Sequence, residues 1–168
     1  MIKKISQAIT PQQAAELADL HRKIAGQKLQ RQNWNLPVIQ NLLQAMQQAA
    51  GVELVQQAPS YIALEQKTQG HPVHADGCVY TAKGWQPNHM SWCKWSASVL
   101  VSDPALCSGG VVKFSDLSVT PFEHYCSLYV WPSHPDSGHA PELHSVTPHS
   151  GCRIVLLFFM AQKQQSQH

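Results

Sequence analysis

The sequence of 168 residues is poor in charge, because only 13% of its residues are Asp, Glu, Lys or Arg. The 12 basic and 10 acidic residues leave a net charge of +2 and are spread along the chain. A protein that tracks a phosphate backbone usually carries a clustered basic face. The missing cluster argues against nucleic acid as the main partner.

Long hydrophobic runs are also missing. The longest extends over residues 154–161, whereas a membrane-spanning helix needs about 20 apolar residues. Residues 1–7 are followed by Gln- and Ala-rich sequence and not by the apolar stretch and cleavage site of a secretory signal. We therefore expect a soluble, cytoplasmic protein without a membrane partner.

Paired cysteine motifs are absent as well. Five cysteines are an odd number, and no C-x-x-C pair of the kind that folds around zinc occurs among them. We expect free thiols in a reducing compartment. A role as small buried hydrophobic side chains is a better interpretation of these cysteines than a catalytic one.

What the chain does have is enough apolar sequence, 43%, for one sizeable core. We expect a single domain over residues 1–168, with a helical part at about 10–50 and a β-barrel at about 52–161. Thr10, Pro11 and Gln13 form a helix start signature, which predicts a helix from Pro11 towards Gln30. Pro37 opens a second amphipathic helix, and Gly51 is placed to end it.

After Gly51 the sequence changes to short β-branched and aromatic runs separated by Gly, Pro, Asp and Ser, which is typical of an all-β unit. The expected fold is mostly β with N-terminal helices (α+β), a sandwich or jelly-roll barrel with two helices packed on one sheet. The candidate strands are residues 52–57, 61–64, 92–101, 111–114, 125–131, 143–146 and 153–160.

His74-Ala75-Asp76 is the first candidate metal-binding pair. On a strand, residues two apart point to the same face, so the imidazole and the carboxylate could close on one ion. Gly70 and Pro72 disfavour a helix here, and with it a helical zinc pair of His71 and His74.

The third ligand is expected to be His144, followed nine residues later by Arg153 at the start of the last apolar strand. Two His and one carboxylate leave three adjacent positions open on octahedral Fe(II), enough for a chelating cosubstrate and O₂. A guanidinium inside an apolar barrel needs an anionic partner. A dicarboxylate such as 2-oxoglutarate provides one.

These motifs resemble the prolyl 4-hydroxylase-like branch of the 2-oxoglutarate/Fe(II)-dependent dioxygenases, over about residues 61–161. A bare H-x-D is a weak signal, but the ordered set with the spacing from His to Arg is specific. Its landmarks are His74-Ala75-Asp76, residues 108–114, Val130-Trp131-Pro132-Ser133, and His144-Ser145-Val146-Thr147-Pro148 with Gly151 and Arg153.

The resemblance implies a double-stranded β-helix (a jelly-roll or cupin-like barrel) in which His74, Asp76 and His144 hold Fe(II) and Arg153 holds 2-oxoglutarate. It implies hydroxylation of an amino-acid side chain, with succinate and CO₂ as coproducts and ascorbate as a supporting reductant. Relatives that halogenate lack the carboxylate of Asp76, so hydroxylation is favoured. A protein or peptide substrate leads, and a free amino acid or other small molecule follows.

The resemblance also assigns further positions. Phe159 matches a bulky aromatic that binds beside the cosubstrate, with plain core packing as the alternative. His71 and Val99 stand where relatives often carry tyrosines that contact 2-oxoglutarate. Residues 77–91, with Tyr80 and Trp85, correspond to a loop that covers the active site, so we expect a lid there.

Several alternatives remain open from the sequence. His134 and His139 are rival third ligands, although only His144 has the spacing to Arg153. A non-catalytic cupin-like metal-binding barrel would give no reason for that arginine. A zinc hydrolase would need a separate general base, for which Glu142 is the only acidic neighbour of His144. Three further histidines, His89, His124 and His149, are expected on the surface or in support of the site.

Overall fold

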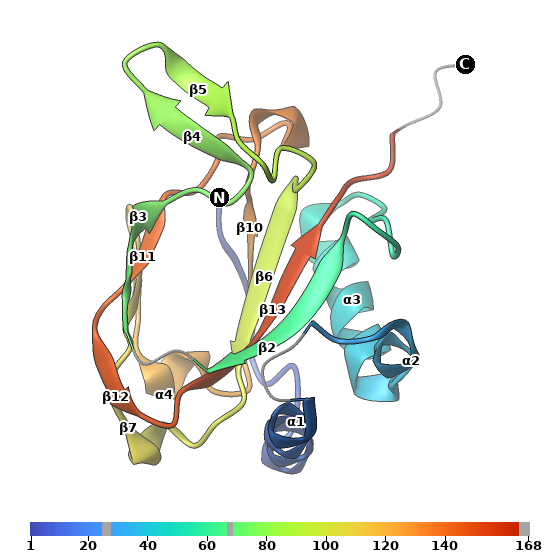
Figure 1. Ribbon diagram of the computed structural model, residues 1–168, viewed down its shortest axis with the longest axis vertical. Coiled ribbons are helices and arrows are strands. Elements are labelled where there is room, and N and C mark those ends of the chain that lie inside the picture. Colours follow the sequence, from blue (N-terminus) through green and yellow to red (C-terminus); the bar gives the residue numbers. More distant parts are fainter. Residues whose placement is uncertain (25–27, 67–68, 165–168) are drawn as a thin grey trace.

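The computed structural model describes residues 1–24, 28–66 and 69–164. In it, the N-terminal helices lie on one side of a β-sandwich (Figure 1). This agrees with the expectation of a mostly β chain with N-terminal helices. The helices are α1 (Pro11–Ile24), α2 (Arg31–Trp34), α3 (Pro37–Ala50) and α4 (Pro121–His124), with 3₁₀ turns η1 (Pro104–Leu106) and η2 (Pro135–Ser137).

Helix α1 begins as the sequence predicts, because Thr10 and Gln13 each donate a backbone N–H to the other's side chain, at 2.9 and 3.1 Å respectively. The prediction that it runs towards Gln30 is wrong, since the helix ends at Ile24. Beyond it, Lys28 forms a bridge with Ala63, and the N–H of Leu29 donates to the carbonyl of Ile62 at 3.0 Å. Pairing with a strand has replaced the helical hydrogen bonds there.

Helix α3 confirms the second predicted helix. Pro37 occupies its first turn, and Gly51 closes it in the left-handed conformation with φ of 72°. Glycine adopts this conformation without steric cost, which explains the stop. The apolar side of α3 is buried, and its members are Ile39, Leu42, Leu43, Met46 and Ala50.

The larger sheet has the order β1-β10-β6-β13-β2 and is antiparallel throughout. The smaller, four-stranded sheet, in the order β3-β11-β8-β9, faces it (Figure 1). Two two-stranded sheets extend the sandwich: β12-β7, whose strands are distant in the sequence, and the hairpin β4-β5. The strands are β1 (Lys3–Ile5), β2 (Tyr61–Gln66), β3 (His71–His74), β4 (Cys78–Thr81), β5 (Gly84–Pro87), β6 (Trp95–Leu100), β7 (Cys107–Gly109), β8 (Val112–Phe114), β9 (Ser118–Val119), β10 (Leu128–Pro132), β11 (His144–Val146), β12 (His149–Gly151) and β13 (Ile154–Met160).

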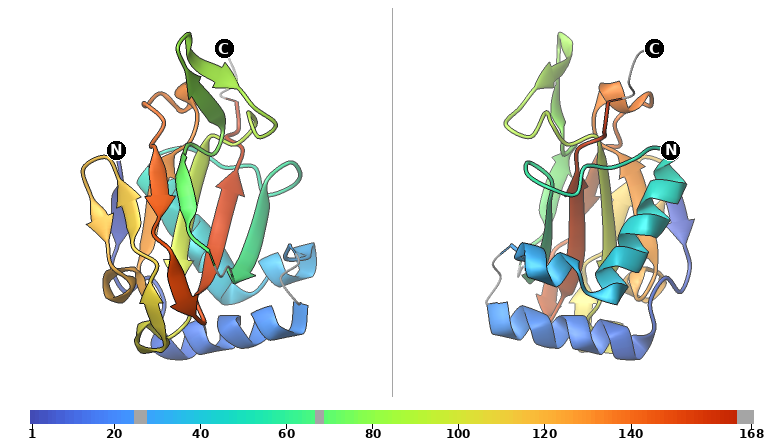
Figure 2. Two further views of the ribbon diagram at one scale, coloured as in Figure 1. Left: turned by 60° about the vertical axis from the view of Figure 1, so that its left-hand side comes forward. Right: turned by 90° about the vertical axis from the view of Figure 1, so that its right-hand side faces the viewer.

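The two faces of the larger sheet have different roles. Successive side chains of a strand point to opposite faces, so Leu156 and Phe158 of β13 join the core under α1 and α3, which cover this face (Figure 2). On the other face, Tyr129 and Trp131 pack against residues of β8 and β9 in a second cluster. The predicted packing of two helices on one sheet is therefore confirmed.

One predicted strand is wrong and several were missed. In residues 52–57 only Leu54 makes a bridge, to Gln162, through the bonds from Val55 N–H to the Ala161 carbonyl and from Lys163 N–H to the Glu53 carbonyl, while the N–H of Leu54 donates to the side chain of Gln47 at 2.9 Å. The missed strands β1, β3, β4, β5, β7, β9 and β12 have two to four residues each, too few for a recognisable alternation. The five cysteines are all free. No helix in the described ranges is long and apolar enough to cross a membrane.

Phe158 and Phe122 give a matched test of this core. The side chain of Phe158 is 0% exposed and that of Phe122, on α4, is 71% exposed. We predict that Phe158→Ala lowers the free energy of unfolding by about 3–5 kcal/mol through lost burial and a cavity. Phe122→Ala should change it by less than about 0.5 kcal/mol. Urea denaturation measures both, and equal losses would contradict the assignment of the core.

Candidate metal centre and adjoining cavity

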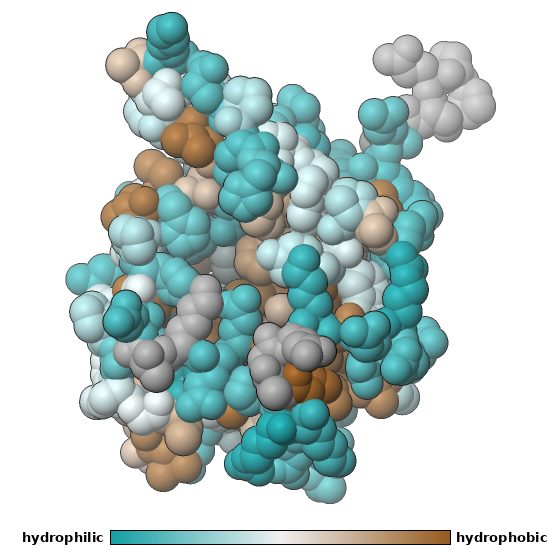
Figure 3. All heavy atoms as spheres, in the orientation of Figure 1, coloured by the Kyte–Doolittle hydropathy of each residue, from teal (hydrophilic) through white to brown (hydrophobic). Residues whose placement is uncertain are grey.

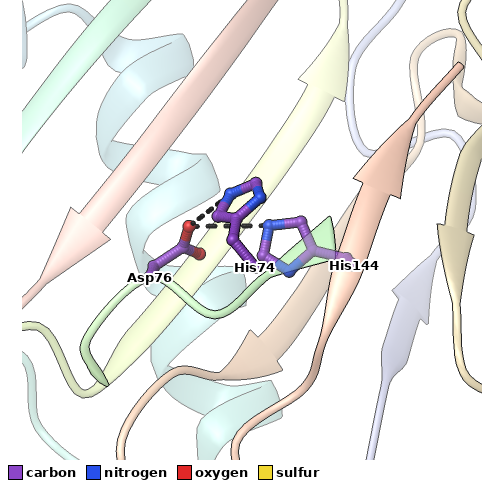
Figure 4. Close-up of side chains that lie close together, drawn as sticks. All are labelled: His74, Asp76 and His144. Carbon is purple, nitrogen blue, oxygen red and sulfur yellow. Dashed lines mark ion pairs between the residues drawn. The ribbon is translucent and has the colours of Figure 1, made fainter. Parts of the chain in front are cut away.

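Three side chains from two adjacent strands meet at one end of the sandwich. His74 ends β3, His144 begins β11, and the two residues are directly paired across the strands. Asp76 follows two residues after His74, and one ligand atom from each side chain lies within 4.8 Å of the other two. Figure 4 shows the three side chains pointing towards one another.

The expectation that His74 and Asp76 share one strand is corrected by the structure. Strand β3 ends at His74, and Asp76 lies in the bend that follows. The chain is held there because the N–H of Gly77 donates to the carbonyl of Ser133 at 2.9 Å. A Cβ at Gly77 would lie 2.2 Å from the carbonyl oxygen of Cys93, so only glycine fits in this bend. The convergence is thus due to a tight turn and not to strand alternation.

Backbone carbonyl groups fix the orientation of both imidazoles. Nδ1 of His74 lies 2.8 Å from the carbonyl oxygen of Pro72, and Nδ1 of His144 lies 3.1 Å from that of Glu142. When Nδ1 donates to a carbonyl, the neutral ring turns an unprotonated Nε2 forward. The two Nε2 atoms lie 3.3 and 3.5 Å from Oδ1 of Asp76. Three electron pairs then face one point, an arrangement that a cation stabilises.

Asp76 is suited to stay ionised although its side chain is only 8% exposed. Burial raises the pKa of this carboxyl, but when the imidazoles of His144 and His74 are protonated and donate to it, their hydrogen bonds and that of Ser96 outweigh burial and hold the pKa well below its usual range. Two imidazole nitrogens and one carboxylate oxygen are the donor set of non-haem Fe(II) sites. The residues present therefore fit a divalent transition metal.

The same three residues line a cavity of about 180 Å³ between the two sheets. Its other described lining residues include Arg153, which directly precedes β13 and is 6% exposed. Burial lowers the pKa of Arg153, no carboxylate opposes this shift, and its Nε has no hydrogen-bond partner among the described residues. The structure thus brings His74, Asp76, His144 and Arg153 to one cavity.

Gly110 makes room for this arginine. Its φ is +73°, and a Cβ there would lie 2.8 and 2.9 Å from Cδ and Nε of Arg153. This glycine therefore has a steric role, because the guanidinium enters the cavity over the bare Cα of Gly110.

Phe159 also lines the cavity, as the resemblance implied, and not the helix-covered core. Its ring centroid lies 5.0 Å from that of Tyr61 on β2, which the sequence had not indicated. Burial, together with the charges of Glu65 and Asp76, raises the pKa of Tyr61 to about 12. Tyr61 is therefore a neutral hydrogen-bond donor at the metal end of the cavity.

The expectation for Val99 is wrong, whereas His71 does line the cavity. Val99 points into the helix-covered core, and its neighbour Ser98 faces the cavity instead. Behind Ser98, its Oγ lies 2.9 Å from Nε2 of His124. His124 is buried and not at the surface, and burial, then the nearby charge of Arg153, lowers its pKa to about 3.

The rival third ligands lie elsewhere. Nδ1 of His134 accepts the N–H of Asp136 at 3.0 Å at the start of η2. The ring of His139 packs on Trp95, 5.6 Å between centroids. Neither lines the cavity among its described walls, so His144 completes the group.

Residues 77–91, predicted as a covering loop, contain the hairpin β4-β5, which projects above the metal end (Figure 1). The rings of Tyr80 and Trp85 face each other across it, 4.9 Å between centroids. The amide of Asn88 donates to the backbone oxygen of Asp76 at 3.1 Å and ties the hairpin base to the site. Apolar side chains lie at this base and just below it (Figure 3).

Comparisons with known proteins agree with this geometry. No protein-family model matches the sequence, and no curated protein matches it. Among solved structures, a prolyl-4-hydroxylase from Pseudomonas putida is 14% identical with a TM-score of 0.64, over 97% of this chain and 93% of that one. A viral collagen prolyl hydroxylase from Paramecium bursaria Chlorella virus-1, in a 2-oxoglutarate complex, is 12% identical with a TM-score of 0.61 (95% and 94%). A Trichoplax adhaerens prolyl hydroxylase, in complex with a hypoxia inducible factor peptide, is 11% identical with a TM-score of 0.59 (95% and 83%). At these identities the likeness shows a shared fold.

His124 should make folding stability depend on pH. Its pKa is 6.5 in the ordinary state and about 3 in the folded chain, so below pH 6.5 only the unfolded chain takes up this proton. Stability from this group is constant above pH 6.5 and falls by about 1.4 kcal/mol per pH unit as pH drops towards 3. We predict that His124→Gln flattens the curve of unfolding free energy between pH 6 and 4, whereas the exposed-residue variant His89→Gln keeps the wild-type slope. An unchanged slope in His124→Gln would refute the burial argument.

Proposed function

We propose that this chain is an Fe(II)- and 2-oxoglutarate-dependent dioxygenase of the prolyl 4-hydroxylase-like branch, with residues 1–168 as one oxygenase domain. One observation carries the proposal. A metal-binding group of two imidazoles and a carboxylate opens into the same cavity as a buried arginine that no described carboxylate neutralises. The two facing antiparallel sheets support a double-stranded β-helix as the fold.

His74, Asp76 and His144 would hold the iron, which when bound supplies the redox chemistry that couples O₂ to hydroxylation. Three protein ligands leave three positions for a chelating cosubstrate and O₂. The protein contributes the fixed imidazole orientation through the carbonyls of Pro72 and Glu142. The ionised carboxylate of Asp76 favours hydroxylation over halogenation, and ascorbate is the expected supporting reductant.

Arg153 is proposed to bind the distal carboxylate of 2-oxoglutarate. A guanidinium desolvated among apolar residues such as Val155 and Leu157 gains most from an anion that matches its fork of donors. Ser98 lines the same cavity with a hydroxyl held by His124, and it is a second candidate donor to the ligand. Phe159 and Tyr61 would enclose the ligand at the metal end.

The alternatives fit these observations less well. A non-catalytic cupin-like barrel leaves Arg153 without a role. A zinc hydrolase needs a general base beside the metal. Besides Asp76, the described cavity wall includes one carboxylate, Glu65, which lies four residues along β2 from Tyr61, or about 13 Å at the rise of a strand. Tyr61, not Glu65, is the β2 residue at the metal end.

The proposed substrate is an amino-acid side chain in a protein or peptide, with a free amino acid or other small molecule as the alternative. The hairpin β4-β5 offers exposed Val79 and Tyr80, and Val73 of β3 lies exposed next to His74. Such an apolar margin suits an extended peptide better than a small polar ligand. The Trichoplax enzyme of the same fold binds a peptide. The free cysteines fit the reducing cytoplasm that we propose as its compartment.

The direct test follows succinate formation from 2-oxoglutarate with Fe(II) and ascorbate. We predict activity and, without O₂, a visible charge-transfer band in the wild type. His74→Ala and Asp76→Ala should lose both, because each removes a metal ligand. Arg153→Ala should weaken 2-oxoglutarate binding by about 2–5 kcal/mol, since one member of a buried charge pair is removed.

Arg22→Ala is the matched control, because Arg22 lies exposed on α1 and pairs only with Asp19 among the described residues. It should behave as the wild type in both measurements. A wild type without the band would refute the proposed function. Wild-type 2-oxoglutarate affinity in Arg153→Ala would show that another residue holds the distal carboxylate.

A second test addresses the peptide substrate. With Fe(II) and 2-oxoglutarate present, a synthetic proline-rich peptide should stimulate succinate formation by the wild type. Replacing residues 79–86 by two glycines should abolish the stimulation while the charge-transfer band stays, since the hairpin lies outside the metal ligands. Phe122→Ala, an exposed aromatic on α4, serves as control. Stimulation that survives the hairpin replacement would remove the hairpin from substrate binding.

A further inference from the structure

The two oxygens of Asp76 have different partners. Oδ1 faces Nε2 of His74 and Nε2 of His144, at 3.3 and 3.5 Å. Oδ2 accepts a hydrogen bond from Nε1 of Trp131 at 3.1 Å. One oxygen is thus turned to the metal position and the other is occupied by an indole N–H.

Trp131 is held rigidly where it makes this bond. It lies on β10, paired with Ser96 of β6, and its side chain is on the inner face of the larger sheet and 3% exposed. Its ring centroid lies 5.3 Å from that of Phe114 and 5.0 Å from that of His144. These two ring contacts pack against the indole in the position from which it reaches Oδ2.

The partners are also mutually dependent. A buried indole N–H without an acceptor costs free energy, and so does a buried carboxylate oxygen without a donor. Both costs are avoided when Trp131 donates to Asp76. The hydroxyl of Ser96 also hydrogen-bonds with Asp76, and its Oγ lies 2.6 Å from Oγ of Ser133. Trp131 is the residue that donates to Oδ2, at 3.1 Å.

We propose that Trp131 is a positioning residue that restricts Asp76 to coordination through Oδ1 alone and so keeps a third position open on the metal. The inference rests on the proposed function. Two imidazoles and one carboxylate oxygen take three of six octahedral positions, and a chelating cosubstrate takes two. A carboxylate that bound through both oxygens would take the sixth, which O₂ needs. The indole N–H competes for Oδ2 and prevents this.

The experiment uses nitric oxide as a probe of that sixth position. Wild type and Trp131→Phe are loaded anaerobically with Fe(II) and 2-oxoglutarate, and nitric oxide is titrated while the iron–nitrosyl signal is followed by electron paramagnetic resonance. We expect the charge-transfer band to form in both proteins. The affinity for nitric oxide should fall at least about tenfold in Trp131→Phe, the scale of lost support behind a metal ligand.

Trp95→Phe is the matched control. Trp95 is also a buried tryptophan of the larger sheet, and its Nε1 donates to Oε1 of Gln162 at the same distance, 3.1 Å, on the face away from the cavity. Its loss should leave nitric oxide binding unchanged. Because Trp131→Phe could also loosen packing, a second variant replaces Trp131 by 3-benzothienylalanine, which keeps the shape of the ring system and removes only the N–H donor.

The outcomes separate the two claims. Weakened nitric oxide binding in both position-131 variants, with the band retained, supports the role of Trp131. Wild-type nitric oxide affinity in the benzothienyl variant overturns it and leaves the proposed function standing. Absence of the band in the wild type overturns the proposed function and this inference with it.

Discussion

The register between β3 and β11 is the constraint on which the rest of the site depends. His74 and His144 are directly paired across these strands, so their imidazoles share one face at a ring distance of 4.4 Å. A slip of one residue would turn one imidazole to the opposite face of the sheet. Strand β8 pairs with the other edge of β11 and sets Phe114 opposite His144. The position of the metal centre is therefore a property of backbone hydrogen bonding before it is one of side chains.

The larger sheet separates two environments with one set of strands. The part of its outer face that α1 and α3 cover is apolar, so the hydrophobic stabilisation of the fold comes mainly from that side. The inner face can then carry polar groups, such as Ser98, Arg153 and Tyr61, without the core depending on them. The helices matter to function for this reason, although none of their described residues lines the cavity.

How much of this was predictable follows from what each signal measures. His74, Asp76, His144 and Arg153 were identified because short motifs and their spacing survive in the sequence, and the structure brings all four to one cavity. Val99 was assigned in place of Ser98 because a strand in which every residue is buried shows no alternation, so its phase cannot be read. Other short strands, such as β1, β9 and β12, were missed since their pairing depends on distant partners.

Trp131 illustrates a further limit of sequence reasoning. It stands in one of the landmarks by which the resemblance was recognised, yet the sequence does not say that its N–H meets a carboxylate 55 positions away. Only the geometry distinguishes this indole from the one of Trp95, which has the same burial and the same kind of hydrogen bond.

The charges of the cavity also limit what it can bind. Asp76 lies at one end of the wall and Arg153, the one Lys or Arg among the described lining residues, belongs to the same wall. Burial lowers the pKa of His124 and of His149, and the nearby charge of Arg153 lowers it further. These imidazoles therefore stay neutral near the guanidinium. The positive charge is thus concentrated on one guanidinium. A ligand that satisfies this wall has to offer a carboxylate to the guanidinium and electron pairs to a metal held by Asp76, and a 2-oxo dicarboxylate combines both in one molecule.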